Sequence, residues 1–164
     1  MYQIISLNKK QLNIIQQLAH KIWPICYASI LSTEQINYML NQFYSLKNLE
    51  NLHQNHHKFV VIYDGDEALG FASFQHNCNN TNKTKLHKIY VLTQQHQKGL
   101  GQKLMDYVIL KAKNKQEKAV YLNVNRNNSA LHFYEKNGFK IIKSEDIEIG
   151  NGYLMEDFVM EKNL

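Results

Sequence analysis

A tyrosine placed shortly before a glycine is the first candidate for chemistry. Residues 127–139 read Asn-Asn-Ser-Ala-Leu-His-Phe-Tyr-Glu-Lys-Asn-Gly-Phe. Asn127 can cap a helix over residues 129–137, and Gly138 can end it. Tyr134 would then offer a phenol of pKa about 10, a general acid of suitable strength toward a thiolate whose conjugate acid has a pKa of about 8 to 9. Taken alone, however, a lone tyrosine of this kind is better explained by core packing.

A basic turn with two glycines lies upstream and is the second candidate. Residues 96–103 read His-Gln-Lys-Gly-Leu-Gly-Gln-Lys and follow an apolar segment. A strand that passes through glycines into a helix leaves backbone N–H groups free at the positive end of the helix dipole, which favours phosphate. A dinucleotide fingerprint would need a third glycine where Leu104 stands, and a P-loop would need Gly-Lys-Ser/Thr. By itself the segment is equally well explained as an ordinary loop.

Composition favours a single domain over residues 1–164. The chain has 164 residues, of which 44% are hydrophobic, and this suffices for a sizeable core. No stretch approaches the roughly 18 apolar residues of a membrane span, and the opening residues lack the apolar block of a signal peptide. We therefore expect a cytoplasmic protein with no membrane partner.

Charge and metal-ligand content argue against other partners. The formal net charge of +5 is spread along the chain, and Arg126 is the one arginine among 19 basic residues. Proteins that read nucleic acid rely on the planar arginine side chain, so we expect no nucleic-acid partner. His53 and His57 have the spacing of helical metal ligands but no further ligand cluster, so we expect no metal. Cys26 and Cys78 form no Cys-x-x-Cys pair and are interpreted as ordinary thiols.

The pattern of apolar residues predicts an α/β fold with a mixed sheet. The expected strands cover residues 3–7, 58–63, 68–75, 86–92, 119–124, 139–149 and 153–160. The expected helices are one that begins after Asn8 and does not continue past Pro24, one from Ser32 to about Lys47, and those over 49–56, 99–114 and 129–137. The strand-helix-strand-helix order in the second half predicts a parallel pair of strands. The result is a central mixed sheet with helices on both faces.

Residues 86–92, the glycine turn and residues 127–139 together resemble the GNAT superfamily of N-acetyltransferases. The resemblance covers about residues 58–162 and implies a GNAT-like acyl-CoA N-acyltransferase fold with acetyl-CoA as the cosubstrate. In this family the turn holds the pyrophosphate and usually begins with Gln or Arg three residues before the first glycine, where this chain has His96. Because the turn binds mainly through its backbone, we expect the departure to be tolerated.

The resemblance also implies roles for individual residues. Tyr134 would protonate the departing thiolate, and a main-chain N–H near Val91 or Leu92 would stabilise the oxyanion. His87 stands where many relatives carry a glutamate, and its intrinsic pKa of about 6.5 suits a general base acting directly or through water, although it could merely line the cleft. The residues that the resemblance assigns to acetyl-CoA are Val91, Leu92, Gln97, Lys98, Gly99, Leu100, Gly101, Gln102, Lys103, Asn127, Tyr134 and Lys136.

The acceptor is expected to be a small amine. In this superfamily it enters opposite the cofactor, and the residues that would form the wall of its site are Trp23, Tyr27, Glu34 and Tyr38. Residues 22–32 and 152–162 are similar to bacterial GNAT proteins that include polyamine acetyltransferases. Acidic residues of the late strands could attract a polycation, although charges on hairpins are more often simply solvated. These residues are Glu145, Asp146, Glu148, Glu156 and Asp157.

Several alternatives stay open at this point. Neither cysteine lies in an evident nucleophile context, so direct attack by the amine in a ternary complex is preferred to an acetyl-enzyme. Peptide α-amines, protein lysines and aminoglycosides are other possible acceptors. A non-catalytic acyl-CoA-binding regulatory module and a nucleotide-binding domain are the rival functions. A homodimer formed through an exposed final strand is the default assembly.

Overall fold

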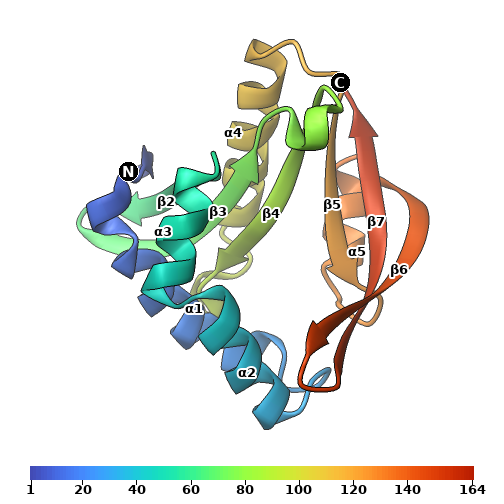
Figure 1. The fold of residues 1–164 in the computed structure, drawn as a ribbon. Coiled ribbons are helices and arrows are strands. Elements are labelled where there is room, and N and C mark those ends of the chain that lie inside the picture. Colours follow the sequence, from blue (N-terminus) through green and yellow to red (C-terminus); the bar gives the residue numbers. More distant parts are fainter.

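The chain forms a central sheet with helices packed on both faces, as the sequence predicts (Figure 1). A computed structural model describes all residues from Met1 to Leu164. The strands are β1 (Tyr2–Ser6), β2 (Lys58–Asp64), β3 (Glu67–Gln75), β4 (Lys83–Val91), β5 (Ala119–Asn125), β6 (Lys140–Gly150) and β7 (Tyr153–Asn163). The helices are α1 (Asn13–Cys26), α2 (Thr33–Phe43), α3 (Leu46–Gln54), α4 (Leu100–Asn114) and α5 (Leu131–Lys136), with short 3-10 helices η1 (Lys9–Gln11), η2 (Cys78–Asn80) and η3 (Thr93–Gln95). None of the helices has both the length and the apolar character that a membrane crossing requires.

The sheet opens between its two parallel strands. Its strand order is β1-β2-β3-β4-β5-β7-β6, and all neighbours run antiparallel except β4 and β5. Those two strands pair in parallel from Lys83 with Ala119 to Leu86 with Leu122, which confirms the predicted parallel pair. The ladder then stops although both strands continue, and the strands diverge beyond it (Figure 1).

The final strand is not an edge of the sheet. β7 pairs with β5 on one side and with β6 on the other, so the outer strands are β1 and β6. The expectation of an exposed final strand is therefore wrong, because the last hairpin folds back and places its first strand outside. A homodimer stays a prediction.

Two hydrophobic cores lie on opposite faces of the sheet. The first includes Leu100, Leu104 and Val108 from α4, and the second includes Ile15 and Ile22 from α1. Successive residues of β2 alternate between the two cores, as side chains along a strand must. Burying one such aliphatic side chain stabilises the fold by roughly 1.5–3 kcal/mol. The two cores hold the helices against the two faces of the sheet.

The first helical segment differs from the expectation at its end. Asn8 accepts a hydrogen bond from the N–H of Lys10, and with Gln11 it forms a capping box that begins η1. α1 then continues past Pro24 to Cys26, so the predicted stop before the proline is wrong. Because the proline lies in the last turn, its missing N–H removes only one helical hydrogen bond.

The second and third expected helices are both present, but the boundary between them lies at Tyr44 and Ser45 instead of near residue 48. Ser32 caps α2 as predicted, with its Oγ accepting from the backbone 3.1 Å away. α2 ends at Phe43, and the hydroxyl of Ser45 caps a new helix, α3, by accepting from the N–H at its third position at 3.2 Å. A serine cap competes with helix continuation because its side chain satisfies the free N–H groups of a new first turn.

A β-bulge interrupts β4 beside the opening of the sheet. Ser73 pairs with Lys88 while the next residue of β3, Phe74, pairs with Leu86, so His87 is the extra residue. A bulge of this kind redirects side chains and is common beside functional sites. It allows both His87 and Lys88 to lie in the cavity described below.

A buried carboxylate fixes the loop that precedes β4. Glu117 is 6% exposed. Its Oε1 accepts a hydrogen bond from the backbone N–H of Asn77 at 2.5 Å, and its Oε2 accepts from the hydroxyl of Thr84 and lies 3.0 Å from Nδ1 of His76. These contacts tie the loop after β3 to the segment before β5, where the parallel ladder begins.

Candidate active site

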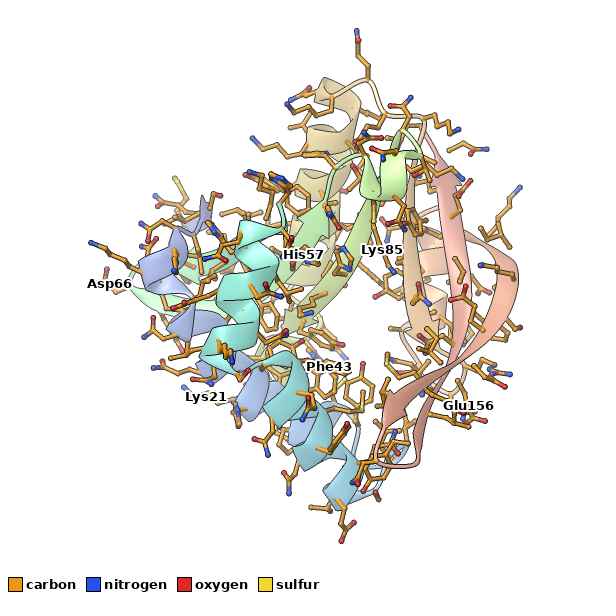
Figure 2. All side chains as sticks on the ribbon, viewed as in Figure 1. Lys21, Phe43, His57, Asp66, Lys85 and Glu156 are labelled. Atoms are coloured by element: carbon orange, nitrogen blue, oxygen red, sulfur yellow. The ribbon has the colours of Figure 1, made fainter.

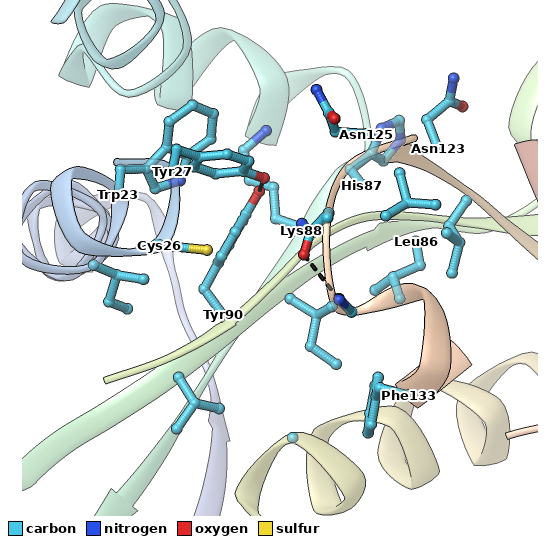
Figure 3. Close-up of a pocket in the computed structure, with 18 of the residues that line it drawn as sticks. Trp23, Cys26, Tyr27, Leu86, His87, Lys88, Tyr90, Asn123, Asn125 and Phe133 are labelled. Carbon is cyan, nitrogen blue, oxygen red and sulfur yellow. Dashed lines mark hydrogen bonds between the residues drawn. The ribbon is translucent and has the colours of Figure 1, made fainter. Parts of the chain in front are cut away.

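A cavity of about 800 Å³ occupies the opening between β4 and β5. It is lined by the second half of β4, the end of β5, the starts of α4 and α5, the aromatic face of α1, and the β6–β7 hairpin (Figure 3). The cavity therefore joins the glycine turn to the early helices, which are far apart in the sequence.

The glycine turn leaves the start of α4 open. Gly99 precedes α4 with φ of 73°, and Gln97 also has a positive φ, of 69°. No side chain caps the helix, so the N–H groups of Leu100, Gly101 and Gln102 have no partner within it. Three free N–H groups at the positive end of a helix fit a phosphate group. The residues present therefore fit the pyrophosphate of CoA.

The two glycines of the turn serve different purposes. A Cβ built on Gly99 would meet no atom within 4 Å, so this position needs glycine for its backbone conformation. A Cβ on Gly101 would lie 3.7 Å from the ring of Phe133 on α5, which is an ordinary contact. Gly101 thus faces α5.

The end of β4 offers one main-chain segment to the cavity. Val91 lines the cavity, and Nε2 of His96 lies 3.2 Å from its carbonyl oxygen. The N–H of Leu92 donates to the carbonyl of Leu69 at 2.8 Å, and Leu92 lies outside the lining. The N–H of Leu92 is therefore already engaged in the sheet.

Tyr134 lies in the cavity wall near the end of α5. It is 8% exposed, and burial raises its pKa above the ordinary value of tyrosine. The helix is preceded by Asn128, whose Oδ1 accepts from the N–H of Ala130 at 2.9 Å and which itself lines the cavity. Asn127 is exposed and lies outside the lining. The predicted cap at Asn127 is therefore wrong, because Ala130 occupies the N-cap position of α5 and no side chain caps the helix.

His87 in the β4 wall is stacked on His57, which precedes β2 and lies outside the cavity lining. The rings of His57 and His87 are stacked with centroids 4.1 Å apart, and Nε2 of His87 lies 3.2 Å from Oε1 of Gln75. Burial, followed by the charge of the other histidine and of two lysines, lowers the pKa of His87 to about 2. Burial and the nearby charges of Lys88 and Lys85 lower the pKa of His57 to about 4 (Figure 2). Both imidazoles are neutral at physiological pH.

Lysines of β4 add positive charge to the same wall. The ammonium of Lys88 lies 5.3 Å from the ring centroid of Tyr44, and that of Lys85 lies 5.7 Å from that of Tyr121. Burial, and then the charge of Lys85, lowers the pKa of Lys88 to about 8. Each cation is stabilised by the ring beneath it.

An aromatic wall faces β4 from α1. The hydroxyls of Tyr27 and Tyr90 are 2.8 Å apart, and Trp23 packs against both rings (Figure 3). Cys26 also lines the cavity, and burial raises the pKa of its thiol. A thiol kept protonated is a poor nucleophile, which agrees with the expectation that neither cysteine carries the acetyl group.

Asp157 on β7 is the only carboxylate in the lining of the cavity. It is 1% exposed, its Oδ2 has no hydrogen-bond partner, and burial raises its pKa. The interpretation of this residue as solvated is therefore wrong. Asp157 and buried Val159 lie on one face of β7, whereas Glu156 is an exposed residue on the other face, where Phe158 and Met160 pack in the first core.

The structure brings most, but not all, of the predicted site residues together. Those in the cavity lining are Trp23, Tyr27, His87, Val91, Gln97, Gly99, Leu100, Gly101, Gln102 and Tyr134. Those outside it are Glu34, Tyr38, Leu92, Lys98, Lys103, Asn127 and Lys136. On α2 the lining residues are Gln35 and Met39 in place of their neighbours, since the hydroxyl of Tyr38 donates to the carbonyl of Ile149 at 2.8 Å and Glu34 is exposed.

An open helix start, a phenol and a split sheet around one cavity define an acyltransferase that uses an acyl-CoA. The comparison with known families agrees: the family described as "Acetyltransferase (GNAT) domain" matches residues 27–162. The chain belongs to the GNAT acetyltransferase family and is an acetyl-CoA-dependent acyltransferase.

Individual relatives span the whole chain. A spermidine N(1)-acetyltransferase of Thermoplasma acidophilum is 26% identical over 167 residues, which cover 98% of this chain and 96% of that protein. The crystal structure of the PaiA N-acetyltransferase of Thermoplasma acidophilum in complex with coenzyme A is 28% identical, with a TM-score of 0.83 and coverage of 100% and 99%. The ribosomal-protein-S18-alanine N-acetyltransferase of Escherichia coli, at 18% identity, a TM-score of 0.75 and coverage of 99% and 94%, shares the fold.

Proposed function

We propose that this protein transfers the acetyl group of acetyl-CoA to a primary amine of a small molecule, favouring a polyamine, by direct attack in a ternary complex. The observation that carries the proposal is the one cavity that joins the open start of α4 to the aromatic wall of α1. Two ligands that enter from these two ends would meet beside Tyr134. The spermidine N(1)-acetyltransferase to which the chain is similar supports a polyamine as the acceptor.

Acetyl-CoA, when bound, supplies the acetyl group and takes up a proton on its sulfur. The free N–H groups of Leu100, Gly101 and Gln102 would bind its phosphate oxygens. The exposed side chains of Lys98 and Lys103 lie on the same turn and first helical turn, where they would add charge at the rim. In these assignments the phosphate oxygens are bound by backbone N–H groups. The side chain at the first position of the turn is then free to vary, and a histidine is acceptable there.

Tyr134 is the proposed proton donor. Its raised pKa keeps the phenol protonated at neutral pH, so the proton is available when a thiolate forms. The same burial makes the phenol a weaker acid than a free tyrosine. Transfer of its proton is therefore favoured only toward a group of high basicity, such as a thiolate held in the same dry cavity.

The role of His87 as a general base stays a prediction. A pKa of about 2 makes its neutral ring a weak proton acceptor, and its Nε2 already faces the side chain of Gln75. If it acts, it would do so by orienting a water molecule or the incoming amine.

The experiment that tests the proposal measures thiol release from acetyl-CoA with a panel of amines. The panel contains spermidine, spermine, an aminoglycoside and a short peptide, and binding of CoA is measured in parallel. Release that depends on a small aliphatic amine is the expected result. CoA binding without release by any amine would contradict the proposal and favour a non-catalytic CoA-binding module, while release with the peptide alone would move the acceptor to peptide amines.

A further inference from the structure

A buried, unpartnered carboxylate in an active-site cavity needs an explanation. Asp157 is 1% exposed, and no hydrogen bond satisfies its Oδ2. An ionised carboxylate buried without a partner is strongly destabilising, so such a group persists where a ligand completes it. Because it lines the cavity, that ligand would reach it from the cavity side.

The groups around Asp157 compensate its charge only in part. It pairs across the sheet with Asn125 on β5 and with Glu145 on β6. A side-chain hydrogen bond from Asn123 and the charges of Lys85 and Arg126 favour the ionised carboxylate, whereas burial and the Glu145 charge oppose it. The guanidinium of Arg126 is already paired with Asp146. None of these contacts supplies a hydrogen-bond donor to Oδ2.

Asp157 and the proposed acid Tyr134 both lie within electrostatic range of Tyr27. The pKa of Tyr27 is raised by burial first and then, among smaller causes, by the charge of Asp157. The pKa of Tyr134 is raised by burial first and then by the charge of Tyr27. Tyr27 is therefore close enough to interact with both groups, and all three residues line one cavity.

We propose that Asp157 is the acceptor subsite: its carboxylate binds the ammonium group of the substrate through Oδ2 and takes one proton from it before acetyl transfer. This inference rests on the proposed function and names the residue that selects a cationic primary amine. In the proton step, an N–H bond of the ammonium breaks, its electron pair stays on nitrogen, and an O–H bond forms on the carboxylate. Asp157 later returns that proton to solvent.

The other charges of the cavity set the direction of the rest of the substrate. Lys85 and Lys88 line the β4 wall, so a second ammonium would be repelled there. The partly exposed carboxylate of Glu145 lies on the hairpin beside Asp157. A polyamine would therefore place its reacting amine at Asp157 and extend its remaining amines past the β6–β7 hairpin.

The test compares Asp157→Asn with Glu156→Gln. Both variants remove one negative charge from adjacent residues of β7, but only the first lies in the cavity. Calorimetric titration of spermidine into the protein, saturated with CoA at neutral pH, should give a Kd raised about tenfold to a hundredfold for Asp157→Asn, as expected for the loss of a charge-assisted hydrogen bond. Glu156→Gln should stay within about twofold of the wild type.

Stability separates a binding role from a structural one. Asp157→Asn removes a buried charge that is compensated only in part, so its melting temperature should equal or exceed that of the wild type while amine binding falls. CoA binding should be unchanged. A lower melting temperature together with unchanged spermidine binding would overturn the proposal and assign Asp157 to the fold.

The pH dependence of spermidine binding provides an independent test. Protonation of Asp157 abolishes its attraction for the ammonium, so spermidine binding should weaken as pH falls through the raised pKa of this carboxyl. In Asp157→Asn that pH dependence should disappear, and its persistence would overturn the proposal. If the wild type binds and acetylates no amine at all, the proposed function itself fails; if it acetylates spermidine and Asp157→Asn does so equally well, only the subsite fails.

Discussion

Replacing Gly99 by alanine tests whether the turn before α4 holds CoA. The residue has φ of 73°, and a Cβ there would meet no atom within 4 Å, so the change introduces no clash within the protein. The left-handed backbone conformation costs an alanine roughly 1–2 kcal/mol. The free energy of unfolding should fall by at most about that amount if the turn keeps its shape.

The effect on CoA binding follows from the same conformational cost. If the variant relaxes to a negative φ, binding must restore the left-handed turn, and the Kd for CoA rises by up to about 5- to 30-fold, the equivalent of 1–2 kcal/mol. Isothermal titration with CoA and urea denaturation measure the two quantities on the same samples. In Gly99→Ala the loss of unfolding free energy and the loss of CoA-binding free energy should together amount to about 1–2 kcal/mol.

Two other glycines provide matched controls. Gly152, in the β6–β7 turn, has φ of 75° and equally open space, so Gly152→Ala should lose similar stability and bind CoA normally. Gly101 is helical, and its Cβ would make an ordinary contact with Phe133, so Gly101→Ala should gain about 0.5–1 kcal/mol and retain CoA binding. If Gly99→Ala loses little stability and still binds CoA as tightly as Gly152→Ala does, the turn does not hold CoA.

Further substitutions test the proposed acid Tyr134, the buried carboxylate of Glu117 and the stacked histidine His87. Tyr134→Phe should lower kcat by roughly 10²- to 10⁴-fold with an unchanged Kd for CoA, and unchanged turnover would remove the phenol from the acid role. Glu117→Ala leaves the N–H of Asn77 unpaired and the hydroxyl of Thr84 with His76 alone, so urea denaturation should show a loss of about 1–3 kcal/mol, and a loss below about 0.5 kcal/mol would refute the role of Glu117 in fixing the loop. The pKa of His87 is lowered to about 2, so its contribution to stability is present above the unfolded value of about 6.5 and is lost as pH falls. Acidification from about pH 7 to 5 should therefore cost the wild type about 2 kcal/mol more than His87→Gln, and equal losses would contradict a neutral buried imidazole.

Local signals in the sequence predicted most of the helices and strands. Glycines at the turns, serine and asparagine caps and strand alternation all act within a few residues, and they placed the hairpins and α4 correctly. The helix boundary at Ser45 was missed because a serine within an apolar helical pattern is usually interpreted as an exposed residue of one continuous helix. The continuation past Pro24 was missed because a proline close to a helix end removes so few hydrogen bonds.

The acceptor side depends on long-range geometry and was predicted less well. Glu34 and Tyr38 lie one position away from the lining residues Gln35 and Met39, since the rotation of α2 is fixed by contacts with a hairpin more than a hundred residues later. Alternation could not single out Asp157, because both faces of β7 carry buried apolar residues, Val159 on the face of Asp157 and Met160 on that of Glu156.

The two hydrophobic cores have a consequence for how such an enzyme can diversify. The core under α4 and α5 supports the turn and the phenol, whereas the core under α1, α2 and α3 supports the aromatic wall, and the sheet separates them. Substitutions that reshape the early helices can be accommodated by repacking one core, without disturbing the other. A lineage can thus inherit its acetyl donor unchanged while it explores new acceptors.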